Sequence, residues 1–370
     1  IAQCLVGSEM CIRDSYVFGR GSLAQLGDLL KPRREAVDGP VVYFVDHFFR
    51  DHELIGRLPM EKGDQLHFVD SSSEPEVTRI DAFKEAVSAA DSRTPCCVVG
   101  IGGGNALDTA KAVANLLTNP GKAEDYQGWE LVKNPAVYKI GIPTLSGTGS
   151  ECSRTCVLTN IPKNLKLGMN SDYTVYDQLL LDPDLLATVP RDQYFYTGID
   201  TFMHCVESLQ GSYRNAIIDA FSVRAVQLCE EIFLSDDMMS EENREKMMIA
   251  SYIGGMAAGN VGVIHPFSAG LGVVLHVAHG LGNCLALNVL GDIYPKEYKQ
   301  FRTMIERQGV NLPTGICKDL TEEQYEGLYR GCIVHEKPLT NALGPDFKQI
   351  LTKENLIERY KSCLLYTSDA

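Results

Sequence analysis

The sequence predicts a two-part chain, an α/β domain with a parallel sheet followed by an all-α domain. From Val41 to about Pro183, short β-branched runs alternate with helical patterns, and such alternation is typical of parallel strands joined by crossover helices. From about Arg191 to Ser362 strand patterns almost vanish, and helical periodicity takes over. The boundary is expected in the segment from Pro183 to Pro190, which should turn and then start a helix.

Individual elements follow from the same patterns. In the first half we expect strands at Val41 to Val45, Gln65 to Val69, Cys97 to Ile101 and Tyr138 to Ile142, and helices at Val77 to Ala90 and Ala106 to Leu117. In the second half, Ala216 to Phe233 and Ser240 to Ala257 have helical periodicity.

Both ends of the chain are expected to be foreign to the protein. Leu5 to Asp14 and Cys363 to Ala370, back-translated in one frame each, correspond to the two strands of a transposon adapter used in sequencing libraries. We therefore expect residues 1–15 and 363–370 to be non-native and exclude them from reasoning about the fold. The α/β domain is then expected at 16–187 and the helical domain at 188–362.

Composition restricts the class of partner. The chain has 34 basic and 48 acidic residues, a formal net charge of −14, which argues against nucleic acid or an anionic membrane as a partner. Cysteines outside the foreign ends are odd in number and lie in hydrophobic stretches, which favours reduced thiols in a cytoplasmic protein. The apolar stretch from Val261 to Leu290 contains His and Gly and predicts a buried helix pair rather than a membrane span.

Four side chains predict a divalent-metal site. Asp200 and His204 are spaced i, i+4 and should project from one helix face, and His265 and His279 would complete a shell of three nitrogens and one oxygen. Such a shell suits Fe²⁺ or Zn²⁺. A single His on a helix usually only satisfies a local hydrogen bond, but three of only eight His in one spaced pattern favour ligands.

The spacing of the last two ligands requires a helix break. On one straight helix, the 14 residues from His265 to His279 would span roughly 21 Å, too far for one ion. Pro266, Gly270 and Gly272 lie between them and can supply the break.

A glycine-rich turn predicts a phosphate site in the first half. The strand ending near Ile101 runs into Gly102, Gly103, Gly104 and Asn105 and then into a helix with Asp108 in its first turn. Backbone amides and the helix N-terminus would face a pyrophosphate there. A tight strand-to-helix turn also needs glycine for conformational reasons alone, so both interpretations stay open.

Two further features favour a dinucleotide. Asp46 ends the strand from Val41 and is placed to accept hydrogen bonds from an adenosine ribose and to repel a 2′-phosphate, which favours NAD over NADP. A second turn, rich in Gly, Ser and Thr, contains Thr144, Ser146 and Thr148 after another strand. The alternatives are a surface Asp and an elaborate exposed loop.

These motifs together resemble the iron-containing, group III alcohol dehydrogenases. The resemblance rests on GGGNALDTAKAVA (Gly102 to Ala114), IPTLSGTGSE (Ile142 to Glu151), the Asp200 and His204 pair, and the run from GVIH to VAHG, in the family's order over nearly the whole chain. It implies the dehydroquinate synthase-like architecture, with metal and nicotinamide in a cleft between the two domains, and a homodimer is the expected assembly.

Residue roles carry over by position. The resemblance places Asp200, His204, His265 and His279 on the metal ligands, and it implies cofactor contacts for Asp46, Gly103, Gly104, Asn105, Asp108, Thr144, Thr148 and Lys166. Two positions depart from the family. Asn105 replaces the usual Ser, and Ala269 stands where many relatives keep a His near the nicotinamide, so the alcohol proton would leave through water, a substrate hydroxyl or His276.

Stretches such as AEDYQGWELV and HEKPLTNALG are most similar to the 3-deoxy-D-manno-octulosonate 8-oxidase branch of this family. That resemblance implies oxidation of a primary alcohol at C8 to an aldehyde, for the 8-amino sugar of lipopolysaccharide, with NAD(P) or dioxygen as the acceptor. Arg154 could bind the sugar carboxylate or form a structural ion pair, for instance with Glu151. The alternatives are a general NAD-dependent alcohol or diol dehydrogenase, and a dehydroquinate synthase-like lyase.

Overall fold

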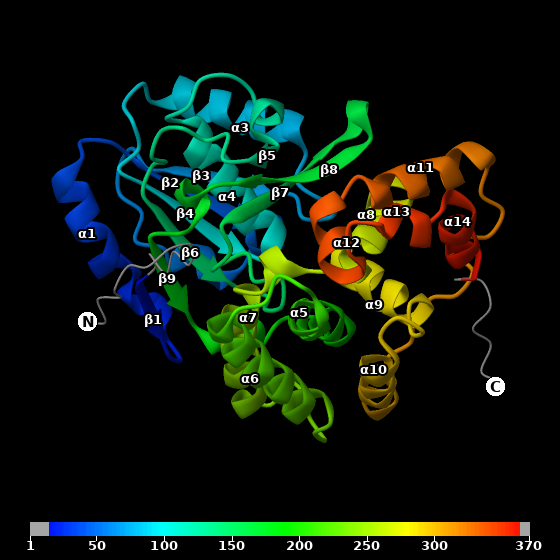
Figure 1. The fold of residues 1–370 in the computed structure, drawn as a ribbon. Coiled ribbons are helices and arrows are strands. Elements are labelled where there is room, and N and C mark those ends of the chain that lie inside the picture. Colours follow the sequence, from blue (N-terminus) through cyan, green and yellow to red (C-terminus); the bar gives the residue numbers. More distant parts are fainter. Residues whose placement is uncertain (1–14, 363–370) are drawn as a thin grey trace. The chain divides into compact units, whose positions relative to one another are not determined.

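The computed structural model describes residues 15–362 (Figure 1), so the predictions for residues 1–14 and 363–370 lie outside the described residues. The chain forms two compact units. The first comprises residues up to 145 together with 150–160 and 167–188, and the second comprises 146–149, 161–166 and the chain from 189 onward.

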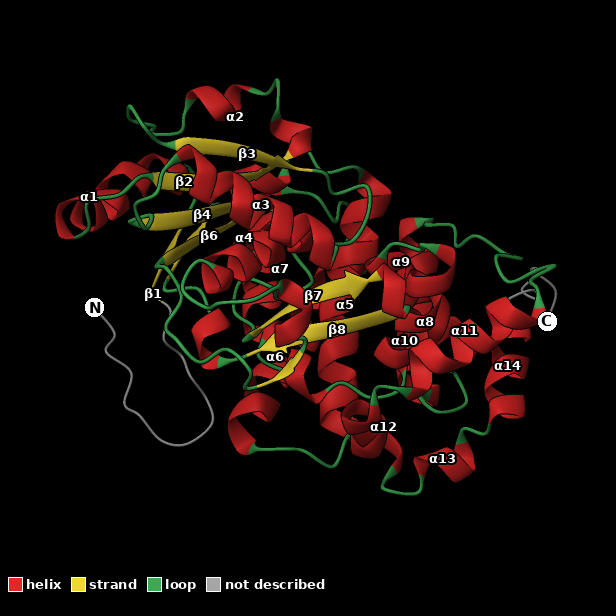
Figure 2. Ribbon diagram, turned by 90° about the horizontal axis from the view of Figure 1, so that it is seen from above, coloured by secondary structure: helices red, strands yellow, loops and turns green. Residues whose placement is uncertain are grey.

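The first unit contains a six-stranded parallel sheet with the strand order β1-β9-β6-β4-β2-β3. Figure 2 shows β3, β2, β4 and β6 running side by side in this order. The strands are β1 (Ser15–Phe18), β2 (Val41–Asp46), β3 (Gln65–Val69), β4 (Cys97–Gly102), β6 (Lys139–Pro143) and β9 (Gln178–Leu181). The parallel sheet predicted from the alternating pattern is confirmed.

Helices cover both faces of this sheet because its strands are apolar on both sides. Val42, Phe44 and Val98 pack with α3 (Val77–Ala90) and α4 (Gly104–Leu116). The alternate residues, such as Val41 and Tyr43, pack with α1 (Leu26–Ala36) and α2 (Glu53–Gly56) on the other face. Because the strands are parallel, the carboxyl ends of neighbours meet at one edge, where the predicted nucleotide residues lie.

A second, three-stranded sheet was not predicted. It has the order β5-β8-β7 and consists of β5 (Gly128–Trp129), β7 (Thr155–Asn160) and β8 (Leu165–Asn170). Strands β1 and β9 were also missed. They are four residues each and too short to show a reliable pattern.

The second unit contains no strand between Val189 and Ser362, which confirms the all-α second half. Helices α5, α6 and α7 pack against one another, while α8 packs against α9 and α11, and α9 also contacts α5. The helices are α5 (Arg191–Gln210), α6 (Ala216–Phe233), α7 (Glu241–Gly255), α8 (Ile264–Leu275), α9 (His279–Val289), α10 (Pro295–Gln308), α11 (Glu322–Ile333), α12 (Glu336–Leu343), α13 (Phe347–Ile350) and α14 (Lys353–Ser362). Within the described range, no helix is long and apolar enough to cross a membrane.

The chain breaks between α8 and α9, as the spacing of His265 and His279 requires. Helix α8 ends at Leu275, and His276 follows in the left-handed region with φ 55° and ψ 30°. Helix α9 then begins at His279 itself. The break lies after the glycines of α8, whose residues Pro266, Gly270 and Gly272 all remain helical.

Gly147 is the position in the second unit where a side chain is least tolerable. Its φ is +145°, and a Cβ there would lie 1.6 Å from the carbonyl oxygen of Thr197 on α5. Its amide donates to Ser251 Oγ at 2.8 Å, and its carbonyl accepts from Thr201 Oγ1 at 3.0 Å, so the loop cannot move away without losing both bonds.

We therefore expect Gly147→Ala to lower the free energy of unfolding by at least about 2 kcal/mol, through backbone strain and displacement of α5. Urea unfolding followed by circular dichroism measures this. The matched control is Gly259→Ala, since a Cβ at Gly259 meets nothing within 4 Å. Equal stability of the two variants would contradict the expectation.

Candidate metal and nucleotide sites

Helix α5 presents a buried carboxylate and a buried imidazole from one face. Asp200 is 0% exposed and His204 is 4% exposed, and His204 Nε2 lies 3.7 Å from Asp200 Oδ1. The i, i+4 spacing on α5 brings the two side chains together, as the sequence predicts.

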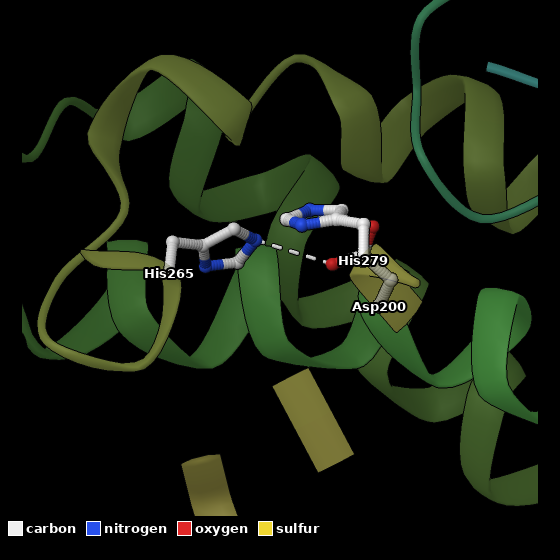
Figure 3. Close-up of side chains that lie close together, drawn as sticks. All are labelled: Asp200, His265 and His279. Atoms are coloured by element: carbon white, nitrogen blue, oxygen red, sulfur yellow. Dashed lines mark hydrogen bonds and ion pairs between the residues drawn. The ribbon is translucent and has the colours of Figure 1, made fainter. Parts of the chain in front are cut away.

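Two more imidazoles reach the same carboxylate from the broken helix pair. His265 is the second residue of α8 and His279 the first of α9. His265 Nε2 lies 3.1 Å from Asp200 Oδ1, and His279 Nε2 lies 3.6 Å from Asp200 Oδ2 (Figure 3). The helix break thus allows His265 and His279, which are 14 residues apart, to face the same carboxylate of Asp200.

This arrangement fits a divalent ion. Ligands about 2.1 Å from an ion at tetrahedral angles lie roughly 3.4 Å apart, close to the separations around Asp200. The ligand atoms of Asp200, His265 and His279 all lie within 4.8 Å of one another. Asp200 Oδ2 is buried and has no hydrogen-bond partner in the described part of the chain, which leaves a lone pair for an ion.

His204 adjoins this trio without belonging to it by distance. Its ring stacks on that of His265, with centroids 4.5 Å apart and planes at 17°. The structure therefore brings all four predicted side chains into one cluster and places three of them at mutual ligand distance.

The side chains of the cluster change one another's pKa values. Burial alone would raise the pKa of Asp200, but His204, His279 and His265 hold that pKa well below its usual range. Burial lowers the pKa of His204 to about 4, against the opposing effect of Asp200. For His265 burial is outweighed by Glu207 and Asp200, which raise its pKa to about 9.

Three residues near the cluster were missed in the sequence. Glu207 follows Asp200 by seven residues on α5 and contacts His265, and Asn283 follows His279 by four residues on α9 and contacts Asp200. Both spacings keep a residue on the same helix face, so the helical period could have identified them. His335, just before α12, has no such signal, because tertiary packing alone brings it near His265.

His335 is a half-buried imidazole with one buried ring nitrogen. Its Nε2 is buried and has no hydrogen-bond partner among residues 15–362. Burial, together with the charges of Lys166 and His265, lowers its pKa to about 4, so it is neutral near neutral pH.

The predicted phosphate turn lies at the carboxyl end of β4. Gly102 has φ +152°, and a Cβ there would lie 2.6 Å from Ala106 Cβ, so glycine is required. Helix α4 begins at Gly104, two residues before the predicted start, with Gly103 as its N-cap. Thr144, after the neighbouring strand β6, donates its amide to the Gly102 carbonyl at 2.9 Å.

Asp46 and Asn105 lie at the same sheet edge. Asp46 Oδ2 accepts from Ser71 Oγ at 2.7 Å and its Oδ1 from the Phe48 amide at 3.0 Å. Asn105 Nδ2 donates to the carbonyls of Ser71 and Ser73 at 3.3 and 3.0 Å. The loop after β3 thus ties the predicted ribose residue to the predicted phosphate turn.

Asp108 has a structural role within the first unit. Its Oδ1 accepts from Ser150 Oγ at 2.5 Å and its Oδ2 from the Val157 amide at 2.8 Å. Lys111, one turn later and 0% exposed, donates from Nζ to the carbonyls of Ser150 and Thr155. Helix α4 therefore holds the chain that follows the second predicted nucleotide turn.

The remaining predicted residues divide between the units. Ser146, Thr148 and Lys166 belong to the second compact unit, and Arg154 belongs to the first. Arg154 forms ion pairs with Glu130 and, at 3.0 Å, with Asp172, rather than with the suggested Glu151. Ala269 on α8 is buried, whereas His276, which directly follows α8, is exposed.

Comparison with known proteins identifies the family. Residues 14–183 match "Iron-containing alcohol dehydrogenase", and residues 194–327 match "Fe-containing alcohol dehydrogenase family, C-terminal". The chain belongs to the iron-containing alcohol dehydrogenase family. It is therefore a metal-dependent alcohol dehydrogenase acting on CH–OH, which confirms the predicted enzyme class.

Individual relatives cover much of the chain. A sulfoacetaldehyde reductase of Bilophila wadsworthia is 34% identical over 220 residues, 58% of this chain and 56% of the reductase. An NAD-dependent methanol dehydrogenase of Bacillus methanolicus is 29% identical over 280 residues, 74% of this chain and 72% of that enzyme. The crystal structure of a sulfoacetaldehyde reductase from Bifidobacterium kashiwanohense with NAD⁺ has a TM-score of 0.78 at 23% identity, covering 98% of this chain and 99% of the other, and shows the shared fold.

We expect His265→Ala and His279→Ala each to weaken binding of Zn²⁺ by more than about 100-fold. Loss of a residue that hydrogen-bonds to a metal ligand typically weakens binding by about 10- to 100-fold, and loss of the ligand itself should cost more. Competition with a chromophoric chelator measures the affinity, and alcohol oxidation should disappear with the metal. His52→Asn is a suitable control, since His52 caps α2 and an Asn can replace that cap. Full activity of a metal-depleted variant would show that the ligands are misassigned.

Metal uptake should depend on pH through His265. In the metal-free protein its pKa is raised from 6.5 to about 9, so the ion must displace a proton below pH 9. The dissociation constant for Co²⁺ should fall about tenfold per pH unit from pH 6.5 toward 9. The same shift stabilises the metal-free fold below pH 6.5, and that stabilisation is lost as the pH rises through about 9. A flat affinity profile over this range would contradict the prediction.

Proposed function

We propose that the chain is an NAD-linked dehydrogenase that interconverts a small primary alcohol and its aldehyde, with a divalent ion held by Asp200, His204, His265 and His279. The observation that carries the proposal is the convergence of three imidazoles on one buried carboxylate, with the ligand atoms of Asp200, His265 and His279 at separations that suit a single ion. A protein with a purely structural metal site needs no nucleotide-binding motif. This chain also has a glycine turn at the edge of its sheet, which favours a catalytic metal.

NAD is the proposed cofactor because of the edge formed by β2, β3 and β4. The carboxylate of Asp46 lies there with Gly102 beside it, since a Cβ at Gly102 would lie 3.0 Å from Asp46 Cβ. An anionic side chain so close to the phosphate turn accepts hydrogen bonds from a ribose and repels a 2′-phosphate. Gly103, Gly104, Asn105 and Thr144 are the proposed neighbours of the phosphates, and Ser146, Thr148 and Lys166 are further proposed contacts.

The proposed chemistry divides between the groups bound and the residues that hold them. A divalent ion supplies Lewis acidity toward an alcohol hydroxyl, and a nicotinamide supplies the hydride acceptor. Asp200 and His204 are buried, and together with His265 and His279 they would hold the ion in a fixed position.

Ala269 has no group that can accept the alcohol proton, so another group must accept it. His276 is the predicted relay but is exposed at the end of α8. His335 is a second candidate, because its Nε2 is buried without a hydrogen-bond partner among the residues described.

A second candidate substrate is 3-deoxy-D-manno-octulosonate, oxidised at C8. It is supported by the resemblance of several stretches to that branch of the family. The carboxylate of this sugar acid would need a cation, and Arg154 is already paired with Glu130 and Asp172. Relatives found in the comparisons, such as the NAD-dependent methanol dehydrogenase, favour a simple alcohol as the substrate.

Purified, metal-analysed protein should be tested with short primary alcohols, diols, their aldehydes and 3-deoxy-D-manno-octulosonate. Both the absorbance of reduced nicotinamide and the formation of peroxide should be followed. The proposal requires turnover of an alcohol or aldehyde with NAD⁺ or NADH. Turnover confined to the sugar acid with peroxide formation would establish the second candidate, and no redox turnover with any compound would reject both.

We expect Asp46→Ser to raise relative use of NADP by about tenfold or more, since it removes a negative charge facing the 2′-phosphate while leaving a hydrogen-bonding group. The ratio of kcat/KM with NAD to that with NADP measures the effect. Asp70→Ser is the control, because Asp70 directly follows the neighbouring strand β3 and its side chain is more exposed than that of Asp46. An unchanged ratio in the Asp46 variant would remove its proposed role.

A further inference from the structure

Glu207 is a buried carboxylate in direct contact with a candidate metal ligand. It is 1% exposed, and its Oε2 forms an ion pair with Nδ1 of His265, the ring nitrogen opposite the one that faces Asp200. Its Oε1 accepts from the backbone amide of Ile264 at 2.6 Å and from the Tyr294 hydroxyl at 3.4 Å. Glu207 therefore joins α5 to the first turn of α8 through the imidazole itself.

Asn283 makes the corresponding contact on Asp200. Its Nδ2 lies 2.6 Å from Asp200 Oδ1, and 3.4 and 3.3 Å from Nε2 of His265 and of His279. The side chain is 0% exposed and comes from α9, one turn after His279. An amide N–H cannot bind a cation, so in this orientation Asn283 is a donor to the carboxylate.

We propose that Glu207 and Asn283 are positioning residues that hold His265 and Asp200 ready for the ion. The inference rests on the proposed metal dependence but concerns two residues outside the ligand set. Glu207 accepts the Nδ1 proton of His265, which leaves the lone pair of Nε2 directed toward Asp200 and the ion. Asn283 fixes the rotation of the Asp200 carboxylate, which leaves Oδ2 directed toward His279.

Charge gives Glu207 a second effect on the centre. Asp200 and Glu207 are both buried, and their two negative charges would balance those of a divalent ion. An imidazole hydrogen-bonded to a carboxylate is also a more basic ligand than one bonded to a neutral group. Replacement by Gln keeps the shape of the side chain and an acceptor oxygen, but it removes the charge.

A purely structural role would have a different signature. The Ile264 amide and the Tyr294 hydroxyl both bind Oε1, and a neutral carboxamide oxygen can accept from them equally well. If these two bonds were the function of Glu207, Glu207→Gln would leave metal affinity unchanged. The effect of the substitution on metal binding therefore separates the two roles.

The test compares Glu207→Gln and Asn283→Ala with wild type and with Glu297→Gln. Glu297 is a matched control, a 9% exposed carboxylate on α10 of the same unit. Dissociation constants for Zn²⁺ and Co²⁺ are measured on metal-free protein, together with the Co²⁺ absorption spectrum and the unfolding temperature. We expect affinities about 10- to 100-fold weaker for both site variants and unchanged for Glu297→Gln.

The Co²⁺ absorption spectrum provides a readout that lost stability would not move. Because Glu207 contacts Nδ1 of the His265 ring, Glu207→Gln should change the spectrum of the bound ion in the folded protein, whereas Glu297→Gln should not. Wild-type affinity and a wild-type spectrum in folded Glu207→Gln would overturn the role of Glu207, and wild-type affinity in Asn283→Ala would overturn that of Asn283. Wild-type protein that binds neither ion would instead reject the proposed function.

A measurement on wild-type protein covers the case in which a variant fails to fold. Nitrogen-15 NMR of histidine-labelled protein with Zn²⁺ should show His265 protonated at Nδ1 and bound to the metal at Nε2, with the signal identified by its loss in His265→Gln. Metal on Nδ1 of His265, or a proton on its Nε2, would overturn the proposal irrespective of any Glu207 variant.

Discussion

The carboxylate of Asp200 is the feature on which the helical unit depends. It is fully buried and ionised, and an isolated ion in a protein interior is costly unless other charges or hydrogen bonds compensate it. Compensation comes from three helices at once: His204 from α5 itself, His265 from α8, and His279 with Asn283 from α9. Packing, charge and metal binding therefore impose the same requirement, that these helix segments meet at one point.

Small residues make that meeting possible. A Cβ at Gly280 would lie 2.5 Å from the Tyr196 carbonyl oxygen, so the start of α9 lies against the backbone of α5 immediately beside His279. A Cβ at Gly282 would lie 2.5 Å from Ser268 Oγ, so α9 also approaches α8 closely. The left-handed turn at His276 reverses the chain between the two helices. The glycines flanking the ligands therefore serve close helix contact, and the turn is made by a non-glycine residue.

The sheet edge that carries the proposed nucleotide residues is built by a different device. In the first unit, parallel strands place the ends of β2, β4 and β6 at one edge, and hydrogen bonds then join the loops there: Thr144 to Gly102, Ser71 to Asp46, and Asn105 to Ser71. Lys111 fixes the segment after β6 by donating to main-chain carbonyls from a position that solvent cannot reach. Preorganised loops on a rigid sheet lose little conformational freedom when a ligand binds.

The sequence by itself determined the order of elements, the parallel sheet, the helical second half and the face shared by Asp200 and His204, because these depend on periodicities of two and 3.6 residues within short stretches. It also required a break before His279, since an unbroken helix would separate two ligands of one ion. Only the tertiary structure decided which side chains support the ligands. The helical period places Glu207 and Asn283 on the ligand faces of α5 and α9, but only packing between helices brings them to His265 and Asp200. His335 and Arg154 have no local signal: His335 lies near His265, and Arg154 pairs with Glu130 and Asp172 in place of its sequence neighbour. Such pairings depend on packing between elements far apart in the chain.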